Sequence, residues 1–153
     1  MPDAIKHSEK EAKINNGLIE YYGPNNPRTI LVAMGSLVGT IKDVIDEHRR
    51  AKGVKLFKSV GVLKIKSFRP FPTLEILRVV KNASQVAVLE KAISLGASDG
   101  PLTLDLKASL KNHCKAKVQG YVMGLGGRDI TKQMIHQVIE NVKQKSDRLK
   151  FVG

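Results

Sequence analysis

The order of apolar and polar residues along the chain predicts short buried strands that alternate with helices. Residues 29–34 are continuously apolar and end at a glycine, and similar runs follow at 60–65, 85–89 and 118–123. Runs that are apolar at nearly every position are typical of parallel strands buried on both faces of a sheet. These four segments are therefore expected to be strands of one mostly parallel sheet.

Each of these strands is followed by a segment whose apolar residues have helical spacing. The longest begins near Leu37, with apolar residues on one face and charged residues on the other, and Ser36 is its expected N-cap. Shorter helices are expected from Thr73, Pro101 and Thr131. This alternation predicts a three-layer α/β domain in which right-handed crossovers cover both faces of a sheet of about five strands.

The N-terminal residues are expected to add an edge to this sheet. Residues 18–22 precede a Gly-Pro-Asn-Asn-Pro turn, and the short connection to the next strand predicts an antiparallel edge strand. Residues 1–16 are a polar N-terminal extension, for which a loosely attached helix is one interpretation. The expected organisation is this extension followed by a single α/β domain over residues 17–153.

Composition restricts the class of protein. The chain has 153 residues, 42% of them hydrophobic, which is enough to bury a core without a covalent staple. Cys114 is the only cysteine, so a disulfide scaffold is excluded. No apolar run approaches the ~20 residues that span a bilayer, and the N-terminus lacks the pattern of a secretory signal. We expect a cytoplasmic protein with no membrane partner.

The net charge of +12 raises the question of a polyanionic partner. More than half of the excess lies between Lys42 and Lys81, where eleven cationic side chains stand against four acidic ones. Nucleic-acid binding surfaces usually interleave such charges with aromatic residues, and this chain has only four Phe and three Tyr. A solvated lysine-rich surface is therefore the favoured interpretation, with nucleic-acid binding as the alternative.

Three glycine-bearing loops, at residues 35–40, 94–100 and 124–129, lie where parallel strands end, which is where ligands bind to open α/β sheets. Two of them carry candidate contact residues. Gly35 and Ser36 begin the first, which has neither a P-loop nor a dinucleotide-binding spacing, so a tight turn into the next helix is its simplest interpretation. The second, Gly124-Leu125-Gly126-Gly127-Arg128-Asp129, has Asp129 in place of the third fingerprint glycine. Backbone amides and Arg128 are candidates to hold a carboxylate or phosphate there, whereas Asp129 or Thr131 is a candidate cap for the last helix.

The remaining polar residues do not assemble into a catalytic set. His113 and Cys114 are adjacent and point apart on a helix, and no spacing of His and Cys predicts a metal cage. His48 and His136 are expected to pack against their helices. Glu90 and Lys91 end a strand, where an ion pair with Arg128 or a subunit contact is expected. The residues therefore indicate a binding or assembly domain more than a complete enzyme.

Four motifs in order carry a resemblance to a known family. They are Met34-Gly35-Ser36-Leu37-Val38-Gly39-Thr40-Ile41-Lys42-Asp43, then Phe68-Arg69-Pro70-Phe71-Pro72, then Val86–Lys91 with Ile93–Gly96, and Gly124–Thr131. Together they resemble the alpha chain of pyruvate:ferredoxin oxidoreductases over about residues 17–142. The region is similar to the C-terminal part of that chain, and the resemblance implies a transketolase C-terminal-like domain with a mixed sheet.

The resemblance implies a role within a larger enzyme. The family uses thiamine diphosphate and Mg to decarboxylate a 2-oxoacid, passes electrons through iron–sulfur clusters to ferredoxin, and makes acyl-CoA. The sequence contains no counterpart of the family's pyrimidine-binding domain, and one cysteine cannot hold a cluster that takes about four thiolates. We therefore expect no cofactor, metal or catalytic residue in this chain, which should be inactive alone and serve assembly and positioning.

The expected partners are the pyrimidine-binding, thiamine- and cluster-bearing, and ferredoxin-like domains or subunits of that enzyme. Arg69, held by the Pro-flanked turn, and Arg128 are the preferred contact residues, together with the candidate anion or inter-subunit contacts Gly35, Ser36, Gly124, Gly126, Gly127 and Asp129. Two alternatives remain open. One is a stand-alone scaffold or regulatory module of the same fold, and the other is a basic nucleic-acid-binding domain.

Overall fold

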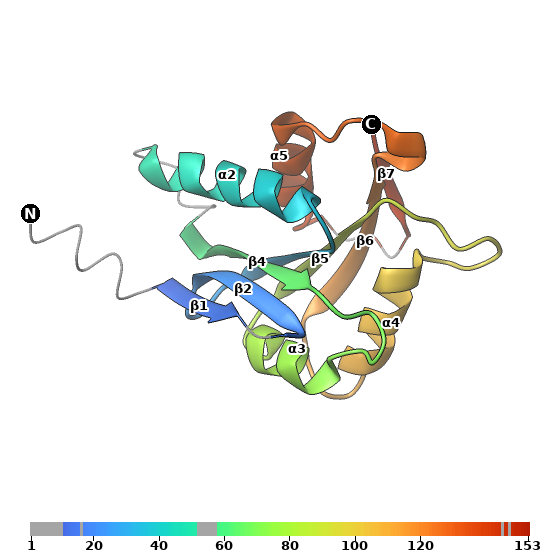
Figure 1. Cartoon of the computed structure of the whole chain (residues 1–153), viewed down its shortest axis with the longest axis horizontal. Coiled ribbons are helices and arrows are strands. Elements are labelled where there is room, and N and C mark those ends of the chain that lie inside the picture. The colour runs from blue at the N-terminus through green and yellow to red at the C-terminus, as the bar shows by residue number, and fades with distance from the viewer. Residues whose placement is uncertain (1–10, 16, 52–57, 145, 147) are drawn as a thin grey trace, which may run out of the picture.

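A seven-stranded sheet lies between two layers of helices in the computed structural model (Figure 1). The structure describes residues 11–15, 17–51, 58–144, 146 and 148–153. The strands are β1 (Glu11–Asn15), β2 (Ile19–Pro24), β3 (Thr29–Ala33), β4 (Val60–Ile65), β5 (Gln85–Glu90), β6 (Lys117–Met123) and β7 (Lys150–Val152). The helices are α2 (Leu37–Arg50), α3 (Thr73–Val80), α4 (Pro101–Leu110), α5 (Lys132–Asn141) and the 3-10 turn η2 (Leu125–Gly127).

The sheet is parallel except at one side. Its strand order is β1-β2-β4-β3-β5-β6-β7, and the pairs β1–β2 and β2–β4 are antiparallel whereas the other four pairs are parallel. The central strand β3 is buried at all five positions because helices cover both of its faces. The carboxyl ends of β3, β4, β5, β6 and β7 consequently meet at one edge of the sheet, which we call the carboxyl edge.

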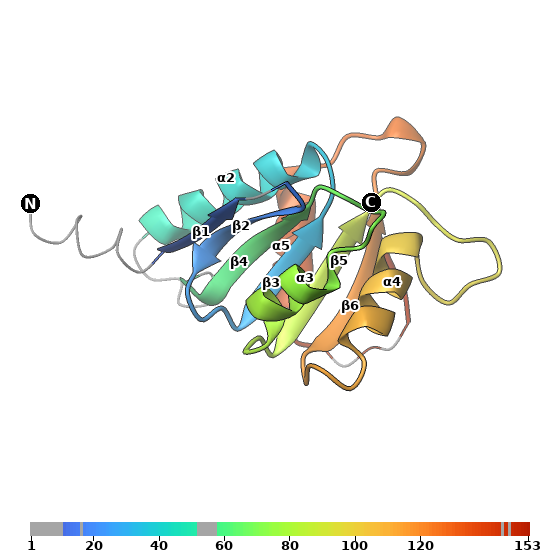
Figure 2. The same ribbon diagram turned by 60° about the horizontal axis from the view of Figure 1, so that its bottom comes forward.

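Two hydrophobic cores lie on opposite faces of the sheet. Leu31 and Ala33 point from β3 into the core beneath α2 and α5, whereas Ile30 and Val32 point into the core beneath α3 and α4. Figure 2 shows the two helix pairs on opposite sides of the strands. This arrangement follows from the two-residue period of a strand, which sends successive side chains to opposite faces. The predicted three-layer, mostly parallel α/β class is confirmed.

The structure corrects the prediction at both ends of the sheet. Strand β2 is antiparallel as predicted, but β1 pairs outside it, so β2 is not the edge. Residues 11–15, for which a helix was one interpretation, form that strand, and residues 1–10 and 16 of the predicted extension lie outside the described part. The sheet therefore includes residue 11, which is earlier than the predicted domain start at residue 17. Strands β1 and β7 together bring the number of strands from the expected five to seven.

The helices follow the predicted pattern, with one difference in capping. Pro101 opens α4, and Thr131 caps α5 by accepting a hydrogen bond from the Met134 amide at 3.3 Å. Ser36 occupies the N-cap position of α2, but its side chain makes no capping hydrogen bond because its backbone is already helical. Each described helix is too short or too polar to cross a membrane.

Candidate functional site

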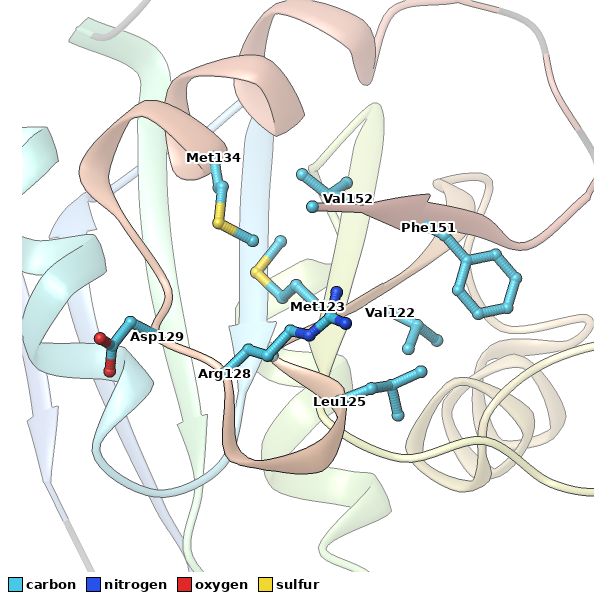
Figure 3. A pocket seen from close by; sticks show the side chains of 10 residues that line it. Val122, Met123, Leu125, Arg128, Asp129, Met134, Phe151 and Val152 are labelled. Carbon is cyan, nitrogen blue, oxygen red and sulfur yellow. The ribbon is translucent and has the colours of Figure 1, made fainter.

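Two pockets lie at the carboxyl edge, one at the ends of β6 and β7 and the other at the ends of β3 and β5. The first is lined by Arg128 and by residues of β6, η2, α5 and β7, and we call it the Arg128 pocket. It has a volume of about 270 Å³ and is lined by Val122, Met123, Gly124, Leu125, Arg128, Asp129, Met134, Phe151, Val152 and Gly153 (Figure 3). Its walls are mainly apolar, and its charged side chains belong to Arg128 and Asp129 alone.

Glycines at positive φ shape the loop that carries Arg128. Gly124, Gly126 and Gly127 have φ angles of 67°, 68° and 77°, in the left-handed region that favours glycine. A β-carbon at Gly124 would also lie 2.9 Å from the side chain of Ile130. The glycines predicted as ligand contacts therefore have a conformational role, because they turn the chain from β6 into η2 and present Arg128 at the pocket.

The two charged residues of this loop point in different directions. Figure 3 shows the Arg128 side chain extending over Met123 while the Asp129 carboxylate lies on the other side of the loop. Both residues are exposed, and no hydrogen bond or ion pair joins them among the described residues. Asp129 does not cap α5, since Thr131 provides that cap. The guanidinium is thus available at the mouth of the Arg128 pocket.

The second pocket is an apolar surface at the centre of the carboxyl edge. It has a volume of about 420 Å³ and is lined by Met34, Leu37, Phe68, Leu89, Glu90, Lys91, Ala92, Pro101 and Leu102. Beside it, the loop over residues 91–100 projects from the body of the domain (Figure 2) and exposes Ile93 and Leu95 at 45% and 93%. We call Met34, Phe68, Ile93 and Leu95 the carboxyl-edge patch. Met34, Ile93 and Leu95 are exposed and Phe68 is half-buried, and apolar surface left uncovered at one edge of a domain is typical of interaction surfaces.

The loop that carries Leu95 is anchored at its end. The Asp99 carboxylate is buried and accepts a hydrogen bond from Lys107 Nζ of α4 at 2.8 Å. Gly96 has a φ of 78°, which turns the chain at the tip of the loop beside Leu95. The loop therefore presents its apolar tip from a fixed base.

Glu90 has a structural role that the sequence did not reveal. Its buried carboxylate accepts hydrogen bonds from the Leu102 amide at 2.9 Å and from the Thr103 amide and hydroxyl at 3.2 and 2.6 Å. These contacts satisfy free N–H groups at the start of α4, where Gly100 in the N-cap position has no side chain to do so. The predicted ion pair between Glu90 and Arg128 does not form.

Arg69, a predicted contact residue, makes its polar contacts within the domain. Its Nη1 donates to Asp105 Oδ2 of α4 at 2.9 Å and to the Phe68 carbonyl at 2.8 Å. The guanidinium carbon also lies 4.3 Å from the centre of the Phe68 ring. With 62% of its side chain exposed, Arg69 joins the turn after β4 to α4 and leaves a charged rim beside the carboxyl-edge patch. Gly35, with a φ of 73°, and Ser36 make the turn from β3 into α2.

His48, His136 and Cys114 pack against neighbouring parts of the domain, whereas His113 is exposed. The rings of His48 and His136 lie 4.2 Å apart between α2 and α5, and burial followed by the charge of His48 lowers the pKa of His136. Cys114 Sγ accepts a hydrogen bond from the Ala116 amide at 3.3 Å. Over the described residues, no three His, Cys, Asp or Glu side chains are arranged to hold a metal ion.

These residues do not fit an iron–sulfur cluster or a magnesium–diphosphate site. The single cysteine of the sequence cannot supply the thiolates of a cluster. Glu90, the buried carboxylate nearest the carboxyl edge, is engaged in capping α4. The chemistry of such cofactors is therefore not assigned to this chain.

The basic segment does not form one continuous surface. Its described cations lie on α2, on β4 and the segments beside it, and on or next to α3, and α2 and α3 cover opposite faces of the sheet. Several of them are paired within the domain, as in Lys42 with Glu20 and Arg69 with Asp105. Dispersed and paired cations favour the interpretation of a solvated surface.

The described residues thus define an α/β domain with two mainly apolar pockets at its carboxyl edge. Residues 28–135 match the family model of the pyruvate:ferredoxin oxidoreductase core domain II, and the chain belongs to this family. It is 45% identical over 135 residues to a pyruvate synthase subunit PorA of Methanocaldococcus jannaschii, covering 88% of this chain and 33% of the relative. The resemblance indicated by the four motifs is confirmed.

Other relatives extend the comparison. The chain is 44% identical over 142 residues to PorA of Methanosarcina barkeri, covering 92% of this chain and 34% of that protein. A ketoisovalerate oxidoreductase subunit VorA of Pyrococcus abyssi is 35% identical over 116 residues, covering 75% of this chain and 28% of the relative. The chain thus spans about a third of the length of its first relatives.

A solved structure shares the fold. The 2-oxoglutarate:ferredoxin oxidoreductase from Magnetococcus marinus, with 2-oxoglutarate, coenzyme A and succinyl-CoA bound, aligns with a TM-score of 0.56 and 19% identity. The alignment covers 85% of this chain and 20% of that one. At this level of identity the match supports the fold assignment alone.

Proposed function

We propose that this chain is an assembly and positioning domain of the alpha subunit of a 2-oxoacid:ferredoxin oxidoreductase. In this proposal the complete enzyme converts a 2-oxoacid and coenzyme A to acyl-CoA and CO2 and reduces ferredoxin in the cytoplasm. Thiamine diphosphate, Mg and iron–sulfur clusters belong to the domains and subunits that accompany this one. The names of the relatives, pyruvate synthase and ketoisovalerate oxidoreductase subunits, support this class of enzyme.

The carboxyl-edge patch is the observation that supports an assembly role. Leu95 is 93% exposed, Ile93 is 45% exposed, and the pocket at Met34 and Phe68 is open to solvent. Apolar surface is therefore left uncovered at one edge of the domain. Burying such surface is favourable by about 25 cal/mol for each Å². The charged rim formed by Lys91 and Arg69 suits a partner face that is apolar at its centre and acidic at its margin.

Glu90, the buried carboxylate at the same edge, is not free for the chemistry of the reaction. Glu90 is held by three donors of α4, and the glycines of the Arg128 loop are required by their backbone angles. A surface that contributes contacts and no reacting group is typical of a positioning domain. We therefore expect the chain to be inactive by itself.

The test is reconstitution of the oxidoreductase that contains this chain. We expect the tagged wild-type chain to recover, under anaerobic conditions, subunits that carry thiamine diphosphate and iron–sulfur clusters, together with 2-oxoacid-dependent ferredoxin reduction. Leu95→Ser should lose this recovery. Leu74→Ser, which replaces a 68% exposed leucine on α3, should retain it. Recovery of nucleic acid in place of those subunits, or equal recovery with both variants, would reject the proposal.

A further inference from the structure

The Arg128 pocket combines one cation with apolar walls. Met123 and Met134 are almost fully buried and Leu125 half-buried, while Phe151 stands at the rim with 67% of its surface exposed. Thioether side chains are polarisable and adapt to alkyl groups of different shapes. The walls therefore suit a short apolar body, and the only positive charge of the lining comes from Arg128.

The guanidinium of Arg128 makes no hydrogen bond or ion pair with any described residue, whereas nearby cations are engaged. Lys132 pairs with Glu47, and Lys42 pairs with Glu20. Figure 3 shows Arg128 reaching over Met123 and Asp129 turned away from it. A guanidinium presents parallel N–H donors that match the two oxygens of a carboxylate. The free N–H donors of the Arg128 guanidinium thus suit an anionic ligand.

The loop around Arg128 is held in this conformation by its own contacts. Gly124 packs against Ile130, and Thr131 fixes the start of α5 through the Met134 amide. The two ends of the loop are therefore attached to buried structure, so that binding here does not require ordering of the backbone. A preformed site loses less entropy when a ligand binds.

We propose that the Arg128 pocket binds a short-chain monocarboxylate. The carboxylate pairs with the Arg128 guanidinium, and the alkyl group lies against Met123, Met134 and Leu125. The single cation of the lining balances the charge of a monoanion, whereas a dianion such as phosphate would leave its second charge without a partner among the apolar walls. The volume of about 270 Å³ suits a ligand of a few carbon atoms.

This proposal goes beyond the proposed function and does not depend on it. It concerns a binding site in the chain itself, whether or not the chain is assembled with other subunits. The pocket of the carboxyl-edge patch shares no lining residue with the Arg128 pocket, so that substitutions in the two sites can be interpreted separately.

The methionines provide the probe. The chain contains four Met, and Met123 and Met134 line the Arg128 pocket, whereas Met34 lies in the other pocket. We would label the methionine methyl groups with ¹³C and titrate the whole chain with isobutyrate at pH 7 and constant ionic strength. Saturable shifts of the Met123 and Met134 signals are expected at a roughly millimolar dissociation constant, with the Met34 signal unchanged.

Two controls separate charge recognition from hydrophobic contact. Isobutyramide has the same alkyl group without the charge and should bind at least about tenfold more weakly. Arg128→Gln should weaken isobutyrate binding by a similar factor, whereas Arg78→Gln, at an exposed arginine on α3, should leave it unchanged. An unchanged Met34 signal in Arg128→Gln verifies that the variant is folded.

Several outcomes would overturn the proposal. They are linear shifts without saturation, equal shifts with isobutyramide, an unchanged affinity in Arg128→Gln, and inorganic phosphate that displaces isobutyrate at equal concentration. Failure of this titration would leave the reconstitution result of the proposed function untouched, because the two experiments use different residues and different readouts.

Discussion

Glu90 caps the helix that begins eleven residues later, and its Oε1 accepts a hydrogen bond from the Thr103 hydroxyl at 2.6 Å. The partners lie at the end of β5 and in the first turn of α4, joined by the loop that carries Leu95. The carboxylate is buried and lies where the partial positive charge of the α4 dipole is concentrated. One side chain thus fixes the helix to the sheet and closes the base of the exposed loop.

Replacing Glu90 with Gln should destabilise the fold. The amide keeps the shape of the side chain, but its NH2 group faces donors of α4, and at least one buried hydrogen bond is lost. We expect the free energy of unfolding to fall by about 2 kcal/mol, measured by urea denaturation. Glu140→Gln, at an exposed position of α5, should change it by less than about 0.5 kcal/mol. Equal effects would show that Glu90 has no capping role.

Gly100 is required by the same carboxylate. A β-carbon at this position would overlap the carboxyl group of Glu90, so Gly100→Ala must displace the cap. We expect a loss of about 2 kcal/mol in unfolding free energy. Gly39→Ala is the matched control, because Gly39 lies in α2 with no atom within 4 Å of its added carbon. That change should stabilise by about 0.5 to 1 kcal/mol, and a destabilisation at both positions would contradict this explanation.

Alanine substitutions at two glycines of the Arg128 loop distinguish the energetic cost of backbone strain from that of steric crowding. Gly124 and Gly126 have φ angles of 67° and 68°, so that alanine costs about 1 kcal/mol in backbone strain at either position. At Gly124 the added carbon also meets Ile130 at 2.9 Å, whereas at Gly126 it enters open space. Gly124→Ala should therefore cost about 1 to 3 kcal/mol more than Gly126→Ala in thermal or urea unfolding. Equal costs would show that the contact with Ile130 relaxes freely.

Tyr121 makes the fold sensitive to alkali. Burial raises the pKa of its phenol from 10.0 to about 12, and its hydroxyl has no hydrogen-bond partner among the described residues. Because the folded state keeps the proton that the unfolded state releases, this contribution to stability is complete below pH 10 and is lost as pH rises towards 12. Tyr21 has a pKa shifted in the same direction by burial.

Because of this, the unfolding free energy of Tyr121→Phe should fall less steeply than that of the wild type as pH rises above 10. At pH 7 the variant should be as stable as the wild type or more stable, because a buried hydroxyl without a partner has been removed. Unfolding free energies measured in urea at pH 7, 10 and 11 give both comparisons. A curve parallel to that of the wild type across this range would contradict the raised pKa.

Much of the fold was predictable because its strands are buried on both faces. The apolar runs of β3 to β6 and the caps at Pro101 and Thr131 are local signals, and the structure confirms them. Strand β1 was missed because a strand at the edge of a sheet, with one neighbour, does not need an apolar run. Strand β7 has only three residues, which are too few to show a recognisable pattern of apolar and polar positions.

The candidate site was predictable only in part. The sequence indicated Arg128 and its glycines, because positive-φ turns favour glycine and a free arginine favours an anion. It did not reveal the cap formed by Glu90, since that contact depends on where β5 ends relative to α4. It also did not reveal that Asp105 engages Arg69 across 36 residues. Such contacts arise from the packing of elements that are distant in sequence.

The role of the carboxyl-edge patch can be measured most directly by hydrogen exchange. Amide exchange should be compared between the chain alone and the same chain within the assembled oxidoreductase. We predict slower exchange in the assembly over residues 91–98, where Ile93 and Leu95 are exposed in the isolated domain, and unchanged exchange in α3. Exchange that is unchanged over 91–98 while α3 or β1 becomes protected would contradict assembly through the carboxyl edge.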